Sequence, residues 1–148
     1  QALLGNPKLI IVDEPTAGLD PNERNRFHNL LSEIGENTIV ILSTHIVEDV
    51  SRLYNNMAII CEGEVVSEGK PIEILKSVEG KTWMKTIEKR ELDAYKRDYQ
   101  VISVKLFAGK TVLHIFSETD PGDGFQPAPS GLEDVYFLTI SQKIDVDL

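Results

Sequence analysis

Hydrophobic residues follow different patterns in the two halves of this chain, and the first half favours parallel strands and helices. Residues 9–12 and 38–42 are apolar runs without regular polar alternation, which is typical of strands buried on both faces of a parallel sheet. Between these runs, apolar residues recur at helical spacing from Phe27 to Ile34. A further short helix is expected over residues 46–53. We therefore expect the first part of the chain to form an α/β unit.

After residue 56 the pattern predicts hairpins and short helices. Glu62-Gly63 separates two strand-like runs, which indicates a β-hairpin. Residues 118–131 contain three prolines and three glycines, which predicts a mobile linker. We predict strands at residues 57–61, 64–68, 81–88, 99–107 and 111–117, and helices at 72–78, 89–98 and 132–140. The strand at 81–88 is expected to lie at a sheet edge.

Charge and pattern together predict two domains, residues 1–79 and residues 80–148. Residues 1–80 carry 6 basic and 13 acidic side chains, whereas residues 81–148 carry 9 and 11. The net charge of −9 argues against nucleic acid as the main partner. The single cysteine, Cys61, cannot form an internal disulfide, and no apolar run approaches the length of a membrane span.

Candidate chemistry begins where the first apolar run ends. Asp13 and Glu14 follow the run directly, and Pro15 stops strand pairing. Open α/β sheets place their ligand sites just beyond the carboxyl ends of parallel strands, so both carboxylates are expected in one crevice. One carboxylate can hold a hard cation such as Mg²⁺, and the other can accept a proton from an attacking water.

Two further residues near this sheet end are candidates, and each has a simpler alternative, which for His45 is that of a polar loop residue. Asp20 can cap the following helix, with Pro21 at its first position, and that cap alone would explain an aspartate there. His45 follows the second apolar run, at the sheet end that holds Asp13, and its imidazole could bond to a phosphate or its water. His28 is interpreted as a solvated helix residue, and His114 as a packing or surface residue of a strand.

The run Leu-Ile-Ile-Val-Asp-Glu-Pro-Thr-Ala-Gly-Leu-Asp-Pro, from Leu9 to Pro21, resembles the Walker B motif and D-loop of ABC-type ATPases. Ser43-Thr44-His45 is similar to the segment in which this family keeps its switch histidine. The resemblance implies that Asp13 holds Mg²⁺, Glu14 acts on the water and His45 contacts the γ-phosphate of ATP. It also implies that the loop with Gly18 and Asp20 crosses to an opposing subunit.

The fold class that this resemblance implies is α/β, an incomplete P-loop NTPase core with a small α+β appendage at the C-terminus. The phosphate loop and signature motif of the family are missing. Gly80-Lys81-Thr82 and Gly109-Lys110-Thr111 copy the end of a phosphate loop, but the earlier glycine that the loop needs is replaced by Leu75 and Val104. We therefore expect this chain to be a piece of a longer protein, inactive alone and a weak binder of ATP.

The function implied is that of the ATP-binding subunit of an ABC transporter, which uses ATP and Mg²⁺ to export an unknown substrate. The expected partners are a second copy of the ATPase domain and a membrane-spanning subunit, at the cytoplasmic face of the plasma membrane. Export is implied by the segment from Leu132 to Tyr136, which resembles the C-terminal extension of ATPases of drug, bacteriocin and natrium-type exporters.

Alternatives remain open, and one expectation concerns assembly. Residues 80–148 could be a regulatory or interaction module, or the parent could be a soluble ABC ATPase without a transport role. In the resembled family, the strand at residues 38–42 lies between the Walker B strand and the phosphate-loop strand, and this second neighbour is absent here. Unpaired strand edges favour pairing with another chain, so we expect self-association through this edge or by exchange of the C-terminal appendage.

Overall fold

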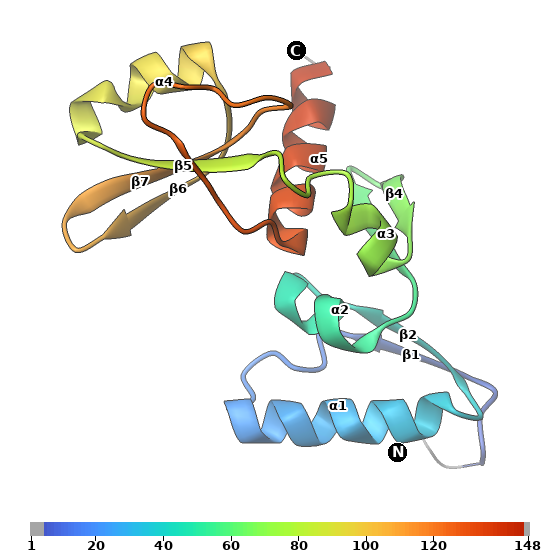
Figure 1. Cartoon of the computed structure of the whole chain (residues 1–148). Helices are drawn as coiled ribbons and strands as arrows, with labels where there is room; N and C mark the ends of the chain where they lie inside the picture. The colour runs from blue at the N-terminus through green and yellow to red at the C-terminus, as the bar shows by residue number, and fades with distance from the viewer. Residues whose placement is uncertain (1–4, 147–148) are drawn as a thin grey trace. The chain divides into compact units, whose positions relative to one another are not determined.

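The computed structural model describes residues 5–146 and forms two compact units, Gln1–Leu53 and Tyr54–Leu148, called unit 1 and unit 2 below (Figure 1). The division of the chain between residues 79 and 80 stays a prediction, because these units describe compactness and not the extent of a domain in a longer protein. None of the helices described between residues 5 and 146 has both the length and the hydropathy needed to cross a bilayer.

Unit 1 consists of β1 (Leu9–Asp13), α1 (Pro21–Gly35), β2 (Ile39–Ser43) and α2 (Val47–Leu53). β1 and β2 pair in parallel over their full length, and α1 packs against β2. The helix connects the two strands, as a parallel pair requires. All four elements lie where the sequence predicted them, within one or two residues at their ends; the start of α1 was indicated by Asp20 and Pro21 and not by the hydrophobic pattern.

The two strands of unit 1 are not buried on both faces, so that prediction is wrong for this chain. Ile10 is 5% exposed, but Ile11, Ile39 and Ile41 are 69%, 67% and 52% exposed. Side chains alternate along a strand, and Ile11 lies opposite Ile41, so these three residues share one face. That face of the pair lies open, and we call it the open face of unit 1.

Unit 2 begins with the predicted hairpin. β3 (Met57–Cys61) and β4 (Glu64–Gly69) pair antiparallel, followed by the short helix α3 (Pro71–Leu75). The turn residues Glu62 and Gly63 have φ angles of 52° and 81°. Two consecutive positive φ values are typical of the hairpin turn whose twist matches that of the flanking strands.

The rest of unit 2 is a four-stranded sheet in the order β6-β7-β5-β8. Its strands are β5 (Thr82–Ile87), β6 (Gln100–Phe107), β7 (Lys110–Phe116) and β8 (Gln126–Pro127). β5 is not simply an edge strand, because β7 pairs along its whole length and β8 pairs with two of its residues. A 3₁₀ turn, η1 (Lys89–Glu91), and α4 (Leu92–Asp98) connect β5 to β6.

The final helix, α5 (Leu132–Val146), extends past the predicted end at residue 140. It contacts β3, β4 and α3 as well as β6, so it packs on both the hairpin and the larger sheet within unit 2 (Figure 1). Lys143 of α5 forms an ion pair with Glu64 of β4 at 2.8 Å. The hydrogen bond from Lys143, followed by its positive charge, lowers the pKa of Glu64.

The core of the larger sheet includes a residue from the segment predicted as a linker. Ile87, Leu113, Ile115 and Phe125 form a buried cluster and are at most 5% exposed. Phe125 belongs to residues 118–131, which also supply β8. The prediction of a mobile linker is wrong, because the apolar ring of Phe125 packs into the core despite the surrounding prolines and glycines.

Candidate functional site

Two adjacent carboxylate residues, Asp13 and Glu14, lie at the end of β1, and their backbone conformations differ. Asp13 is the last strand residue and accepts a hydrogen bond from the hydroxyl of Ser43 on β2. Glu14 has a φ of 44°, in the left-handed region that non-glycine residues rarely adopt, while its N–H donates to the carbonyl of Ser43 at 3.0 Å. This backbone reversal directs Glu14 differently from the strand residues before it.

Glu14 and His45 are in direct contact. The backbone N–H of His45 donates to Oε1 of Glu14 at 2.9 Å, and Nδ1 of His45 lies 2.8 Å from Oε2. The side chain of Glu14 is 35% exposed and that of His45 is 72% exposed, so solvent reaches both residues, whereas Oε2 of Glu14 itself is buried. The structure therefore brings together Glu14 and His45, two of the three residues that sequence reasoning placed at one sheet end.

This contact determines what the imidazole can do. In the neutral tautomer with hydrogen on Nδ1, His45 keeps that N–H beside Oε2 of Glu14 and presents Nε2 as an acceptor, for example for a water molecule. In the imidazolium form both nitrogens donate, so His45 can bond to Glu14 and to an anionic oxygen at once. The pair can thus orient water next to a carboxylate that accepts protons.

The fit of this site to Mg²⁺ rests on one carboxylate. Within residues 5–146, no group of three or more His, Cys, Asp or Glu side chains is arranged to hold a metal ion. Mg²⁺ is commonly bound by one or two carboxylates together with phosphate oxygens and waters. Asp13 is exposed and its partner is a hydroxyl, so its carboxylate fits the protein's share of such a site.

Gly18 and Asp20 have local roles in the loop between β1 and α1. Asp20 caps α1, because its Oδ1 accepts hydrogen bonds from the N–H groups of Asn22 and Glu23 at 2.8 and 2.9 Å. Gly18 has a φ of 79°, which favours glycine. The structural alternative for Asp20 is thus confirmed, and a role of either residue toward a nucleotide stays a prediction.

A buried polar cluster in unit 1 was missed by sequence reasoning. The hydroxyl of Thr16 donates to Oδ2 of Asp49 at 2.9 Å, and the two residues are 1% and 6% exposed. Nε2 of His28 lies 3.3 Å from Oδ1 of Asp49, and Nη1 of Arg24 lies 3.8 Å from the same oxygen. His28 is 5% exposed, so its interpretation as a solvated residue is wrong.

The sequence held only part of the signal for this cluster. Arg24 and His28 are four residues apart on α1, so a common face could have been inferred. Their shared partner, Asp49, is on α2, and Thr16 is 33 residues away from it in the chain. No local periodicity connects these segments.

In unit 2, His114 is paired with a buried carboxylate. Nδ1 of His114 lies 3.1 Å from Oδ1 of Asp134, and the two side chains are 18% and 10% exposed. Burial raises the pKa of Asp134, but hydrogen bonds from His114 and from the N–H of Gly131 outweigh burial, so the pKa is lowered. This pair joins β7 to the first turn of α5.

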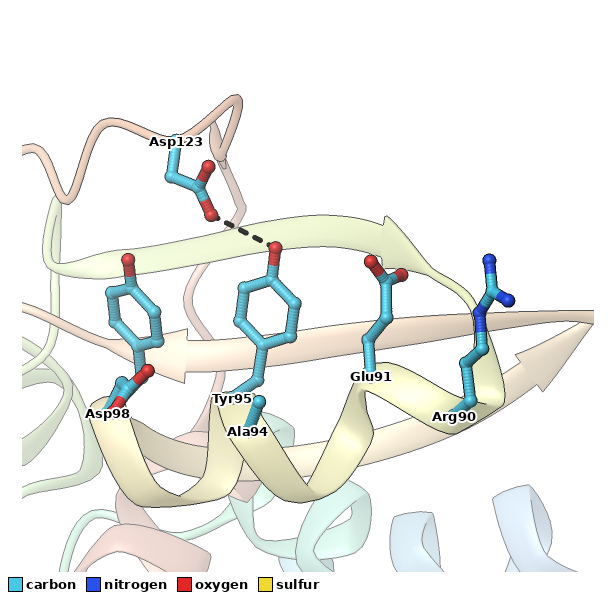
Figure 2. A pocket seen from close by; sticks show the side chains of 7 residues that line it. Arg90, Glu91, Ala94, Tyr95, Asp98 and Asp123 are labelled. Atoms are coloured by element: carbon cyan, nitrogen blue, oxygen red, sulfur yellow. Dashed lines mark hydrogen bonds between the residues drawn. The ribbon is translucent and has the colours of Figure 1, made fainter.

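A shallow pocket lies beside α4 in unit 2 (Figure 2). It is lined by Arg90, Glu91, Ala94, Tyr95, Asp98, Tyr99 and Asp123. Figure 2 shows Tyr95 projecting from α4 toward Asp123 on the facing loop, and its hydroxyl donates to that carboxylate at 3.0 Å. Lys85 also pairs with Asp123, at 2.7 Å.

Two charged residues of this pocket, Asp123 and Arg90, are paired with other residues of unit 2. The hydrogen bond from Lys85, followed by that from Tyr95, lowers the pKa of Asp123, and Asp123 in turn raises the pKa of Lys85. Arg90 pairs with Glu88 at 2.7 Å. The site with the clearer chemistry is therefore Glu14 and His45 in unit 1.

Comparison with known proteins shows which proteins this chain is similar to. It is 30% identical over 155 aligned residues to the "Nod factor export ATP-binding protein I" of Cupriavidus pinatubonensis, which covers 97% of this chain and 47% of that protein. It is 40% identical over 78 residues to the protein of the same name from Cupriavidus metallidurans, which covers 52% of this chain and 26% of that protein.

A third relative is the "Energy-coupling factor transporter ATP-binding protein EcfA2" of Clostridioides difficile, 40% identical over 74 residues, which cover 49% of this chain and 26% of that protein. No protein-family model matches the chain. The chain thus spans less than half the length of each of these three relatives.

Proposed function

Because ATP-binding proteins of transporters are homologous to this chain over part of their length, we propose that it belongs to an ABC-type ATPase subunit that drives export. Its mixture of parallel α/β structure in unit 1 and α+β structure in unit 2 is consistent with a partial ABC ATPase fold. The word "export" stands in the names of two relatives, and the substrate of this protein is left open.

The observation that carries the proposal is the contact between Glu14 and His45 at the end of β1. Phosphoryl transfer to water requires that the water be placed in line with the γ-phosphate, and a nearby carboxylate can orient it or accept its proton. Glu14 is positioned by two contacts to His45, one through the backbone and one through the ring. We infer that Glu14 acts on the water and that His45 holds Glu14 while offering Nε2 to the γ-phosphate or its water.

Asp13 is the residue that we propose to hold Mg²⁺. A bound Mg²⁺ would offset the negative charge of the β- and γ-phosphates. The carboxylate of Asp13 needs to face the nucleotide for this role, and its hydrogen bond from Ser43 restrains its rotation. Gly18 and Asp20 would help to shape the loop that meets a second ATPase domain.

The proposed partners follow from the same homology. A second ATPase domain would complete the nucleotide site, and a membrane-spanning subunit would use the energy of hydrolysis. The relatives are named as ATP-binding proteins of transporters, which supports such a partner. We place the protein at the cytoplasmic face of the plasma membrane, and we expect the chain alone to be inactive.

The proposal is tested with Glu14→Gln in the full-length protein that contains this chain. Glutamine keeps the size of the side chain but cannot accept a proton, so hydrolysis is expected to fall on the order of a hundredfold or more. ATP binding should persist. Turnover is measured by phosphate release and binding by calorimetry, each with Mg²⁺ present.

The matched control is Glu33→Gln, which makes the same chemical change at an exposed position on α1. The control should hydrolyse ATP at the rate of the unaltered protein. If Glu14→Gln and Glu33→Gln turn over ATP equally, Glu14 does not act on the water. If the unaltered full-length protein neither binds nor hydrolyses ATP, the proposed function is wrong as a whole.

A further inference from the structure

We propose that Thr16 and Asp49 are positioning residues that hold Glu14 and His45 in contact, an inference whose catalytic meaning rests on the proposed function. Neither residue belongs to the site predicted from the sequence. Both are buried in unit 1, and their hydrogen bond joins the same two segments that the contact between Glu14 and His45 joins.

The hydrogen bond between Thr16 and Asp49 is a second cross-link between the two segments, close in sequence to the contact between Glu14 and His45. Thr16 lies two residues after Glu14, and Asp49 lies four residues after His45. The hydroxyl of Thr16 donates to Oδ2 of Asp49 at 2.9 Å, in a region where the two residues are 1% and 6% exposed. The ring of His45 is largely exposed, and its contact with Oε2 of Glu14 is not a hydrogen bond, so by itself this contact would be held weakly. The buried cross-link is protected from competition by water.

Short turns connect each end of the buried cross-link to the site. On the first segment, the N–H of Ala17 donates to the carbonyl of Glu14 at 3.1 Å, which closes a turn around Thr16. On the second segment, the N–H of Asp49 donates to the carbonyl of Ile46 at 3.1 Å, one residue past His45. A displacement of Thr16 or Asp49 is therefore expected to be transmitted to the backbone of Glu14 or His45.

The α1 helix holds the carboxylate of Asp49 from its other side. Nε2 of His28 and Nη1 of Arg24 lie 3.3 and 3.8 Å from Oδ1, so each oxygen of Asp49 has its own neighbours. These contacts leave Oδ2 directed to Thr16. A buried carboxylate is costly unless it is paired and hydrogen-bonded, and here one hydrogen bond from Thr16 and two close contacts from α1 favour one arrangement of α1, α2 and the loop after β1.

The first test is kinetic and uses the full-length protein. Thr16→Val removes the hydroxyl but keeps the shape of the side chain, and Thr16→Ser keeps the hydroxyl. We expect Thr16→Val to lower kcat for ATP hydrolysis about tenfold, because small misplacements of catalytic groups have effects of this order or larger. KM for ATP should change by less than about twofold, since the buried pair is placed behind Glu14 and His45 and not at the nucleotide. Thr16→Ser should recover most of kcat.

Thr82→Val is the matched control for a general loss of stability. Thr82 in unit 2 is also 1% exposed, and its hydroxyl also donates at 2.9 Å, to the carbonyl of Ala128. This variant should keep kcat. Equal losses of kcat in Thr16→Val and Thr82→Val, or no loss in Thr16→Val, would overturn the proposal.

The second test does not depend on ATPase activity. Nitrogen NMR of the imidazole of His45 in this chain reports whether Nδ1 remains next to Glu14. We expect Thr16→Val to shift these signals toward those of Glu14→Gln, while Thr16→Ser leaves them near the wild-type positions. Asp49→Asn provides a second variant with unaltered shape and should shift them in the same direction.

The two tests separate failure of this inference from failure of the proposed function. If the full-length protein has no ATPase activity but Thr16→Val shifts the His45 signals, the positioning role stands and the proposed function fails. If ATPase activity is present and the His45 signals of Thr16→Val and Asp49→Asn match those of wild type, the positioning role is wrong and the proposed function stands.

Discussion

The two units of this chain bury different kinds of side chain. Among the described residues of unit 1, those classed as buried are two hydrophobic and three polar or charged. In the described part of unit 2, ten hydrophobic residues, three polar or charged ones and Pro71 are buried. The buried residues of unit 1 are Ile10, Leu31, Thr16, His28 and Asp49. Unit 1 thus has a polar centre, whereas unit 2 has an apolar core.

The two interiors are therefore expected to serve different purposes, the stability of the fold in unit 2 and the positioning of site residues in unit 1. In unit 2, the burial of apolar side chains is the main contribution to stability, and the sheet packs Leu113 and Ile115 at 0% exposure. In unit 1, the open face leaves Ile11, Ile39 and Ile41 in solvent, while the hydrogen bond from Thr16 to Asp49 and the contact of His28 with Asp49 lie in the interior. We infer that unit 2 maintains its fold largely by packing and that unit 1 uses its interior to orient the residues of the site.

If unit 2 is stabilised by its apolar core, the largest loss of stability is expected from Leu113→Ala in that unit. Leu113 is fully buried, and truncation leaves a cavity, so the free energy of unfolding should fall by about 2–5 kcal/mol. Urea unfolding followed by the fluorescence of Trp83, the single tryptophan, reports on this unit. Leu106→Ala on the neighbouring hairpin strand is the control, because Leu106 is 77% exposed and should change stability by less than about 0.5 kcal/mol. Similar costs for both variants would contradict an apolar core centred on Leu113.

A smaller effect is expected from Asp134→Asn, which alters a polar residue inside the apolar unit. Asp134 accepts from the N–H of Gly131 at 2.7 Å and faces His114, and the loss of its charge should destabilise unit 2 by about 1–2 kcal/mol at neutral pH. Its pKa is lowered in the folded state. The stabilisation is therefore complete above the ordinary carboxyl pKa of 3.8 and is lost as the pH falls through the folded pKa.

The measurement is the urea midpoint of wild type and Asp134→Asn as a function of pH. The difference between the two should shrink as the solution is acidified below pH 3.8. Asp93→Asn, at an exposed position in α4, serves as the control with the same chemical change. A difference that stays constant down to the acid unfolding of the protein would show that the charge of Asp134 does not contribute.

The smallest effect on stability is expected at the open face of unit 1. Replacing Ile11 and Ile41 by lysine alters exposed positions, so the free energy of unfolding should change by less than about 0.5 kcal/mol for each. Self-association should decrease instead, because charge disfavours the pairing of open strand surfaces between chains. Light scattering over a range of concentrations measures this. Ile60→Lys, at a 64% exposed position of β3, is the control, and an equal decrease there would locate the association elsewhere.

Local sequence determined where the secondary structure lies and which residues carry the candidate chemistry. The apolar runs located β1 and β2, Asp20 and Pro21 marked the start of α1, and Glu62-Gly63 marked the first hairpin turn. The acids after β1 and the histidine after β2 were expected at one sheet end, because the ends of parallel strands meet there. These features depend on residues close in the chain or on the geometry of parallel pairing, so the sequence is sufficient.

Tertiary structure alone decided what is buried and what is exposed. An apolar run cannot show whether a neighbouring element covers both faces of its strand, and Ile11 and Ile39 are exposed because one face of the β1–β2 pair is open. A proline- and glycine-rich segment cannot show that Phe125 enters a core. The burial of His28 and Thr16 around Asp49 depends on three segments brought together by folding, and each contact joins residues 21 or more positions apart. The free energy of such contacts depends on partners distant in sequence, which is why the polar centre of unit 1 emerged only from the folded chain.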